Sequence, residues 1–382
     1  MQLIDFDIDG FLRNYWQKKP LLIRNPWSSW QNPIDPDDLA GLACEDDVES
    51  RIIIQTGETW TLESGPFPEA RFSHPGRQPW TLLVQAADHF VQDVAALIAP
   101  FRFVPNWRVD DVMVSYAPDG GGVGPHFDQY DVFLIQGLGR RRWQVGAACD
   151  AATPLLPHAD LRLLATFEPT DEWILEPGDI LYVPPGVAHN GVALGDDCMT
   201  YSIGFRAPAR HDLIVEWCDH IVESVPDDDR YADPDLSRQD NPGEISASAL
   251  ARLHAMMMET MLDRDAFARW FGQYNSIPKY PDADWRPEEP IDRTELRVLL
   301  AGDGSLCRNP ASRFSFIRQA DGILLFVDGE CFACDDATAA FAERLCAQDR
   351  IQIEPAFATA PTLVDLIVAL YNQGSVTIEP GD

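Results

Sequence analysis

Three residues of this 382-residue chain have the types and the spacing of a metal site: His126, Asp128 and, far downstream, His189. Side chains two positions apart on a β-strand point to the same face, so His126 and Asp128 can bind one ion while Phe127 points into the opposite layer. His189 follows an apolar run and a Pro-Gly turn, which predicts that it lies near the start of another strand. Two histidines and one carboxylate bind one face of Fe(II) and leave its other positions open to a co-substrate and dioxygen.

The residues before this triplet favour a site built on strands. A strand-like stretch at 111–116 is followed by glycines at 120–124, which let the backbone turn sharply just before His126. The glycines alone would indicate only a hairpin, and a His-x-Asp triplet also occurs by chance. The prediction of a metal site therefore depends on finding the triplet, the distant histidine and the strand pattern together.

Strand alternation separates the three consecutive arginines at 140–142. Arg141 shares a face with Trp143 and Val145, whereas its two arginine neighbours lie on the other face. An arginine on an apolar face is expected to be buried, and a buried guanidinium group needs an anionic partner. A carboxylate held by two parallel hydrogen bonds fits that requirement. The alternative is a basic triplet at the surface that pairs with nearby acidic residues.

Longer motifs resemble one enzyme family. They lie at residues 11–23, 121–145 (which include the motifs 128–133 and 139–143), 184–189, 230–236 and 242–245. These segments look like the JmjC-type, cupin-fold oxygenases that use iron and 2-oxoglutarate. More narrowly, they resemble the bacterial ribosomal oxygenases, which hydroxylate an arginine of large-subunit ribosomal protein sixteen. The resemblance extends over most of the chain, and neither the metal triad nor Arg141 departs from it.

The resemblance implies roles for particular residues. His126, Asp128 and His189 would bind Fe(II), Arg141 would hold the distal carboxylate of 2-oxoglutarate, and Ser115 is a further candidate for the same pocket. Dioxygen would convert 2-oxoglutarate to succinate while the β-carbon of the substrate arginine is hydroxylated. Two acidic residues that flank the site in the sequence, Asp119 and Asp131, are candidates to receive the cationic substrate side chain.

Three other functions remain open at this point. A JmjC-type demethylase would use the same cofactors on an N-methyl group. A metal-binding cupin of another activity, such as an isomerase, would not consume 2-oxoglutarate. A noncatalytic module that binds ribosomes would need neither, and the complete triad argues against it.

The formal charge of −32 is the strongest compositional feature. It predicts repulsion from a phosphate backbone, so direct binding to DNA is not expected. A basic protein partner would instead be attracted, which agrees with a ribosomal protein substrate. An acidic surface also serves solubility alone, so charge does not choose the substrate.

Other compositional features predict a cytoplasmic protein. No apolar run approaches the roughly 20 residues that span a bilayer, and the first residues lack the pattern of a secretory signal. The eight cysteines are scattered, which favours reduced thiols. Cys331 and Cys334 form one Cys-x-x-Cys pair without two further ligands nearby, so we interpret it as structural.

The first of three predicted regions, residues 1–208, is expected to be the catalytic domain. Helices are predicted at 11–16 and 35–43 and a strand at 80–85, and strands dominate from 110 to 205. Several short strands separated by glycine and proline turns suit a double-stranded β-helix, the jelly roll of cupin and JmjC proteins. The fold class is therefore mainly β with added helices.

Two further regions are predicted after the barrel. Residues 209–289 carry apolar residues at helical spacing in 213–222 and 250–262, with a polar loop at 226–243 between them. This region either packs on the barrel or forms a homodimer, as the resembled family does. Residues 290–382 alternate helices (294–300, 336–347, 362–371) with strands (313–319, 322–327, 330–333) and resemble a winged-helix domain. Its acidic residues outnumber its arginines and it has no lysine, so we expect a structural or protein-contact role.

Overall fold

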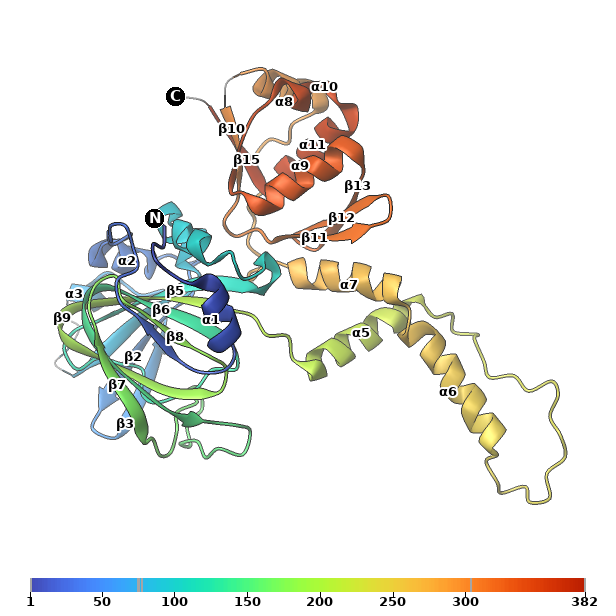
Figure 1. Cartoon of the computed structure of the whole chain (residues 1–382), viewed down its shortest axis with the longest axis horizontal. Coiled ribbons are helices and arrows are strands. Elements are labelled where there is room, and N and C mark those ends of the chain that lie inside the picture. The colour runs from blue at the N-terminus through green and yellow to red at the C-terminus, as the bar shows by residue number, and fades with distance from the viewer. Residues whose placement is uncertain (1, 74–75, 77, 303, 381–382) are drawn as a thin grey trace. The chain divides into compact units, whose positions relative to one another are not determined.

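The computed structural model describes residues 2–73, 76, 78–302 and 304–380 (Figure 1). Their contacts divide the chain into two compact units. Unit 1 comprises Met1–Ala207, Lys279–Asp284 and Asn309–Ala311, and unit 2 comprises Pro208–Pro278, Trp285–Arg308 and Ser312–Asp382. In the described part of the chain, no helix is both long enough and apolar enough to cross a membrane.

Unit 1 is built on a sheet of nine strands, with short helices before the main strands. Its N-terminal elements are α1 (Ile8–Asn14), β1 (Leu21–Ile23), α2 (Pro36–Leu42), β2 (Ser50–Thr56), β3 (Thr59–Ser64), α3 (Ala70–Ser73), β4 (Trp80–Val84), η1 (Ala87–His89), α4 (Gln92–Ala95), η2 (Ala96–Phe101) and η3 (Asn106–Arg108). The strands that follow are β5 (Val109–Ala117), β6 (Asp131–Ala148), β7 (Pro169–Leu175), β8 (Ile180–Val183) and β9 (Val187–Phe205).

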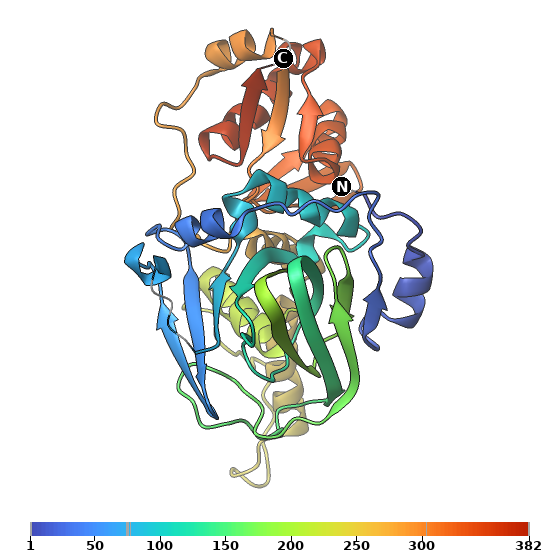
Figure 2. The ribbon, with the colours of Figure 1, turned by 90° about the vertical axis from the view of Figure 1, so that its left-hand side faces the viewer.

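Two long strands, β6 and β9, organise the sheet of unit 1. The strand order is β1-β8-β6-β9-β5-β4-β2-β3, and β7 pairs with the second half of β6. β9 pairs with β6 along most of its length and continues to β5, so one strand links both halves of the curved sheet seen in Figure 2. Because every pairing is antiparallel, inward and outward side chains alternate along each strand.

The second half of β6 shows this alternation directly. Arg141, Trp143 and Val145 are buried, with 2%, 4% and 2% of their surface exposed. The arginine on the N-terminal side of Arg141 is exposed, and the one on its C-terminal side is half-buried. The prediction that Arg141 faces the interior is confirmed, and the reading of 140–142 as a surface triplet is wrong.

The helical part of unit 2 consists of α5 (Arg210–Ser224), α6 (Ala247–Met261) and α7 (Arg264–Ser276). No helix or strand lies between α5 and α6, in agreement with the predicted loop. Trp217 and Ile221 of α5 pack with Trp270 of α7, and the rings of the two tryptophans are 5.2 Å apart. α6 contains no buried residue.

The rest of unit 2 has two small sheets, ordered β14-β10-β15 and β11-β12-β13, with helices packed around a common core. Its elements are α8 (Arg293–Leu300), β10 (Gly304–Arg308), β11 (Phe314–Gln319), β12 (Gly322–Val327), β13 (Glu330–Cys334), α9 (Asp336–Ala347), β14 (Arg350–Gln352), α10 (Pro355–Thr359), α11 (Pro361–Asn372) and β15 (Val376–Pro380). The predicted helices and strands of 294–371 are therefore present, while β10, β14, β15 and α10 were not predicted.

Cys331 and Cys334 both lie on β13 and are free thiols. Cys334 is buried, and the Cys331 sulfur accepts a hydrogen bond from the Arg269 guanidinium at 3.2 Å. Neither belongs to a group of three or more metal-ligating side chains among the described residues. These contacts favour the structural interpretation of the pair.

Candidate metal centre and substrate cavity

His126 and His189 face each other through an isolated antiparallel bridge. The His126 amide donates to the His189 carbonyl at 3.0 Å, and the His189 amide donates to the His126 carbonyl at 2.8 Å. His189 is the third residue of β9, directly after the predicted Pro-Gly turn. His126 and Asp128 lie on a connection between β5 and β6 rather than on a regular strand. The predicted strand at 126–128 is therefore absent, and the backbone of His126 is held instead by its isolated bridge to His189 of β9.

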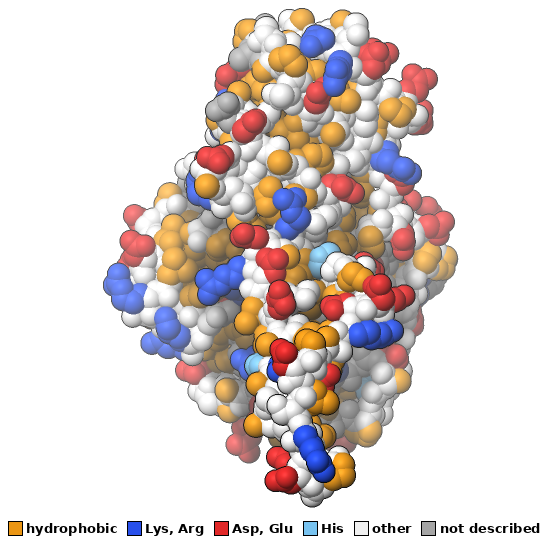
Figure 3. Space-filling model, turned by 90° about the vertical axis from the view of Figure 1, so that its right-hand side faces the viewer, with side chains coloured by type: hydrophobic (Ala, Val, Ile, Leu, Met, Phe, Trp, Pro, Cys, Tyr) orange, Lys and Arg blue, Asp and Glu red, His pale blue; other side chains and the backbone are white. Residues whose placement is uncertain are grey.

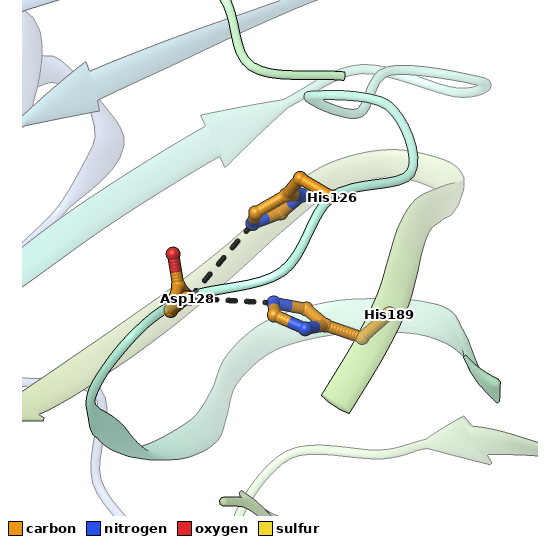
Figure 4. A group of neighbouring side chains, drawn as sticks. All are labelled: His126, Asp128 and His189. Carbon is orange, nitrogen blue, oxygen red and sulfur yellow. Dashed lines mark ion pairs between the residues drawn. The ribbon is translucent and has the colours of Figure 1, made fainter. Parts of the chain in front are cut away.

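Asp128 completes a triad whose side chains point toward one another (Figure 4). An Asp128 carboxylate oxygen is 3.6 Å from Nε2 of His189 and 4.0 Å from Nε2 of His126. One ligand atom from each residue lies within 4.8 Å of the other two. The turn after β8 holds the Asp128 backbone, because the Gly186 amide donates to the Asp128 carbonyl at 2.7 Å. The structure thus brings together the three residues predicted to bind a metal.

Hydrogen bonds orient both imidazole rings. Nδ1 of His126 lies 2.9 Å from the Gly124 carbonyl, and Nδ1 of His189 lies 3.0 Å from the Val187 carbonyl. A carbonyl only accepts, so each Nδ1 carries the proton and each Nε2 offers a lone pair to the centre of the triad. Burial, followed by the neighbouring charge of His126, lowers the pKa of His189 to about 4. His189 is therefore neutral, as a metal ligand must be, near neutral pH.

The donor set fits the predicted metal. Two imidazole nitrogens and one carboxylate oxygen on a single side are the ligands of non-haem Fe(II) oxygenases, and they leave the opposite side open. A structural zinc site would instead be closed by a fourth protein ligand. Among the described residues, the triad is the one group of three or more close His, Cys, Asp or Glu side chains. The open side faces a cavity.

This cavity has a volume of about 380 Å³ and is lined by all three triad residues. Arg141 and Ser115 line the same cavity, so the structure gathers every residue predicted to bind metal or co-substrate. A volume of this size can hold a small dicarboxylate and part of a second molecule. The prediction from sequence therefore placed five residues from four separate segments in one pocket.

Arg141 lies in the cavity wall with an unused hydrogen-bonding group. Its Nε donates to the Cys198 sulfur at 3.4 Å, and its guanidinium carbon lies 5.8 Å from the centre of the Trp143 ring. Its Nη2 is buried and has no hydrogen-bond partner among the described residues. A buried, unpaired guanidinium edge is costly, and an anionic ligand would satisfy it. Ser115 is buried nearby, and its hydroxyl donates only a long bond of 3.4 Å to the Thr200 carbonyl.

The two predicted substrate residues do not line the cavity. Asp119 is exposed and accepts a hydrogen bond from the Gly195 amide at 2.7 Å, which fixes the turn within β9. Asp131 is fully buried, and its carboxylate accepts from Tyr182 Oη at 2.6 Å and from Gln17 Nε2 at 2.8 Å. Arg108 pairs with the same carboxylate at 3.1 Å. These contacts argue against a substrate contact by either aspartate and favour structural roles.

Several cavity residues were missed by reasoning from the sequence. The cavity is also lined by Asp110 and Asp111 of β5, by Tyr130, and by Lys279. In a regular strand, consecutive aspartates point to opposite faces. The pairing of β5 with β9 shifts register between Val109 and Val112, and this irregularity allows both carboxylates to reach the cavity. The available sequence signal was a pair of consecutive aspartates, Asp110 and Asp111, at the start of a strand. Strand alternation, however, predicts that only one of them faces the cavity.

The acidic wall of the cavity is partly neutralised. Burial lowers the pKa of Lys279, but the charges of Asp111 and Asp110 and their hydrogen bonds outweigh that effect, so the pKa lies above its usual value. Burial and then the charge of Asp111 raise the pKa of Asp88 to about 8. Asp88 therefore carries a proton at neutral pH and adds no charge beside Asp111.

Two family models match the chain. The JmjC domain matches residues 96–213, which include the whole triad and Arg141, and the ROXA-like winged helix matches residues 255–377. The predicted fold class, a JmjC cupin barrel followed by a winged-helix domain, is confirmed. The second match starts inside α6, so it includes α7 as well as the C-terminal sheets.

Curated relatives and solved structures agree with these matches. The ribosomal protein uL16 3-hydroxylase of Escherichia coli is 40% identical over 309 residues, covering 77% of this chain and 82% of the relative. A probable ribosomal oxygenase of Haemophilus influenzae is 35% identical over 311 residues, covering 77% and 74%. The crystal structure of E. coli YcfD has a TM-score of 0.90 at 35% identity, covering 99% of this chain and 100% of that one. The structure of YcfD, a ribosomal oxygenase from E. coli, in complex with cobalt and 2-oxoglutarate has a TM-score of 0.87 at 35% identity, and the match covers 99% of both chains.

The predicted resemblance is therefore confirmed by sequence and by structure. A relative with 40% identity over most of both chains shows common descent. The metal triad and the buried arginine add the chemistry that such a protein requires. The chain belongs to the JmjC-domain ribosomal oxygenases.

Proposed function

We propose that this chain is an Fe(II)- and 2-oxoglutarate-dependent hydroxylase that acts on the β-carbon of an arginine in ribosomal protein uL16. One observation carries the proposal: Arg141 lines the cavity that also holds the metal triad, and its buried Nη2 has no hydrogen-bond partner among the described residues. A guanidinium in that state needs an anion, and a dicarboxylate that also reaches the metal would satisfy it. A curated relative supports the substrate, since the E. coli protein is named a uL16 3-hydroxylase, and carbon 3 of an amino acid is its β-carbon.

Each residue has a definite task under this proposal. His126, Asp128 and His189 hold Fe(II) through Nε2, a carboxylate oxygen and Nε2. Arg141 holds the far carboxylate of 2-oxoglutarate, and Ser115 adds a hydroxyl in the same pocket. The cobalt and 2-oxoglutarate complex of YcfD supports this pair of ligands, because both bind a protein of the same fold.

The reaction consumes substrate, 2-oxoglutarate and dioxygen and yields hydroxylated substrate, succinate and carbon dioxide. When bound, the metal supplies the site at which dioxygen is reduced while 2-oxoglutarate loses its carboxyl group. The residues of the chain orient the reactants and exclude bulk water from the open side of the triad. His189 is almost fully buried, which lowers its pKa to about 4, so it is neutral near neutral pH.

The charge of the chain supports a basic protein partner. A net charge of −32 attracts a basic ribosomal protein and speeds their encounter at low ionic strength. The same charge opposes binding to nucleic acid, so we propose no DNA-binding role for the winged-helix region. A ribosomal substrate also makes the cytoplasm the proposed compartment.

Mass spectrometry of purified uL16 tests the proposed function. Incubation with the enzyme, Fe(II), 2-oxoglutarate and air should add one oxygen atom to the target arginine, and fragmentation should place it on the β-carbon. Omitting 2-oxoglutarate or using His126→Ala should leave the mass unchanged. Loss of a methyl group from a methylated peptide would favour the demethylase instead, and the absence of succinate with every substrate would favour a cupin of another activity.

We also propose that α5 and α6 form a homodimer interface. α6 has 15 residues and buries none of them, and three apolar side chains at helical spacing are exposed: Leu250 (56%), Leu253 (41%) and Met257 (64%). Figure 3 faces this helix and the loop before it, and hydrophobic side chains are visible there among acidic ones. An apolar helical stripe is stable in water when it packs against another surface. We further propose that the chain consists of a catalytic domain at 1–208, a helical dimerisation region at 209–289 and a winged-helix-like domain at 290–382.

Light scattering after size exclusion should show a dimer for the wild-type protein. Leu253→Glu combined with Met257→Glu should convert it to a monomer, because two carboxylates would be buried in the interface. Arg252→Glu, on the opposite side of the same helix, is the matched control and should remain dimeric. A monomeric wild-type protein at micromolar concentration would contradict the interface.

A further inference from the structure

Lys279 is the most unexpected residue of the cavity. It follows α7, and the segment Lys279–Asp284 belongs to unit 1 although its neighbours on both sides belong to unit 2. Its ammonium nitrogen lies 2.9 Å from an Asp110 carboxylate oxygen and 3.1 Å from an Asp111 carboxylate oxygen. Only 20% of its side chain is exposed. A cation from a distant part of the sequence thus lies in the wall of the cavity that contains the triad.

The Asp111 carboxylate is held in place by hydrogen bonds from its neighbours. One oxygen of Asp111 accepts from Gln85 Nε2 at 2.6 Å and from the Ala86 amide at 2.9 Å. Both aspartates lie at the irregular start of β5, and both reach the Lys279 ammonium nitrogen. The next residue of the segment is also anchored, because Tyr280 Oη donates to a Glu49 carboxylate oxygen at 2.9 Å. The geometry is therefore that of a preformed site for a cation, with Lys279 bound in it.

The charges of the wall leave room for one more cation. Apart from the triad and Arg141, the charged lining consists of three carboxylates (Glu49, Asp110 and Asp111) and two cations (Arg51 and Lys279). With all five groups ionised this set carries one excess negative charge, and burial raises the pKa of Asp111 within it. A positively charged substrate side chain would balance it, whereas a neutral side chain would not.

The type of cation at position 279 is also informative. The chain has only three lysines among its 29 basic residues, at positions 18, 19 and 279. An ammonium group is a compact point charge on a flexible stem, so it can exchange one acceptor for another. Arginine would hold two carboxylates through a rigid fork and would be harder to displace.

We propose that Lys279 is a competing cation that occupies the cation position of the cavity and yields one of its two carboxylates to the cationic side chain of the substrate, so that it sets the affinity of the cavity for that side chain. Identifying that side chain as arginine rests on the proposed function. Lys279 acts as an internal competitor, since the free energy of breaking its ion pair subtracts from the binding of any ligand that takes one of its carboxylates. Only a cationic side chain can take a carboxylate from Lys279. A neutral side chain leaves both ion pairs intact, so its affinity does not depend on Lys279.

Two substitutions of Lys279 should act in opposite directions. Lys279→Met removes the competitor with little change in length, so a uL16 peptide with the target arginine should bind roughly fivefold to tenfold more tightly. Lys279→Arg should bind the same peptide several-fold more weakly, because the guanidinium fork holds both carboxylates. A peptide with citrulline, the neutral isostere of arginine, should not gain affinity in Lys279→Met. Binding is measured by fluorescence anisotropy with 2-oxoglutarate and Co(II), without turnover.

The controls separate this role from a structural one. Lys19→Met makes the same change in charge at an exposed lysine and should leave both affinities unchanged. If Lys279 only braced the wall, Lys279→Met would weaken both peptides alike and Lys279→Arg would behave as wild type, which would overturn the inference. Should Lys279→Met fail to fold, wild-type affinity in Lys279→Arg is enough to reject it.

The same measurement distinguishes this inference from the proposed function. If the arginine peptide binds as described but no variant hydroxylates uL16, the proposed reaction fails and the role of Lys279 stands. If uL16 is hydroxylated while the ratio of arginine to citrulline affinities is the same in wild type and Lys279→Met, the role of Lys279 fails alone.

Discussion

Replacing Arg141 with methionine is expected to raise the KM for 2-oxoglutarate about a hundredfold while leaving metal binding intact. Removing one partner of a buried, hydrogen-bonded charge pair costs roughly 2–5 kcal/mol, and about 2.8 kcal/mol corresponds to a factor of one hundred. Methionine preserves much of the length of the side chain, so the wall next to Trp143 remains filled. Succinate formation at increasing 2-oxoglutarate concentration gives the KM, and titration with Co(II) gives the metal affinity.

Stability gives an independent readout of the same substitution. The buried Nη2 of Arg141 has no hydrogen-bond partner among the described residues, so Arg141→Met should not lower the midpoint of thermal unfolding measured without 2-oxoglutarate. Arg140→Ala, at the exposed neighbouring position, should change neither KM nor midpoint. Arg141→Lys keeps the charge but loses the fork, and roughly a tenfold rise in KM is expected. An unchanged KM in Arg141→Met would remove the carboxylate role from Arg141.

Replacing Asp131 with asparagine is expected to destabilise unit 1 by roughly 3–5 kcal/mol, because it leaves a largely buried guanidinium without its counter-ion. Arg108 is 14% exposed and pairs with a carboxylate that is fully buried. The amide group of asparagine would also face the Gln17 donor, so one of the present hydrogen bonds is lost. For a unit of about this size, the midpoint of thermal unfolding should fall by roughly 6–15 °C.

Asp119→Asn is the matched control for this prediction. Asp119 is exposed, and an asparagine oxygen can still accept from the Gly195 amide, so a change within about 0.5 kcal/mol is expected. Differential scanning fluorimetry of both variants gives the comparison. A normal midpoint for Asp131→Asn together with a raised KM for the uL16 peptide would instead restore the substrate contact that the sequence suggested.

The part of the site that the sequence predicted is the part governed by local periodicity. Alternation along one strand placed Arg141 inward with Trp143, and the Pro-Gly turn placed His189 at the start of β9. Side-chain direction in a strand follows from two-residue periodicity, which can be read without knowing the partner strand. The prediction for Asp131 rested on its closeness to the triad in the sequence. Closeness in sequence does not show which side of the cavity wall a residue faces, so that prediction was misleading.

Residues whose position depends on irregular or long-range structure could not be predicted in this way. Asp110 and Asp111 reach one cavity only because the register of β5 shifts, and a bulge leaves no periodic trace in a single sequence. The role of Asp131 was decided by Arg108, Gln17 and Tyr182, which come from three other segments.

The sequence by itself predicted the triad of His126, Asp128 and His189 that the structure brings together, the buried arginine between apolar neighbours, the order of barrel and winged helix, and the acidic charge. Only the tertiary structure decided that Lys279, 90 residues beyond His189, returns to the cavity and pairs with two carboxylates there. Local patterns fix the direction of a side chain, because neighbouring backbone geometry sets it. Whether charged residues far apart in the sequence come into contact depends instead on how the chain between them folds. No periodic pattern in the sequence encodes that long-range path.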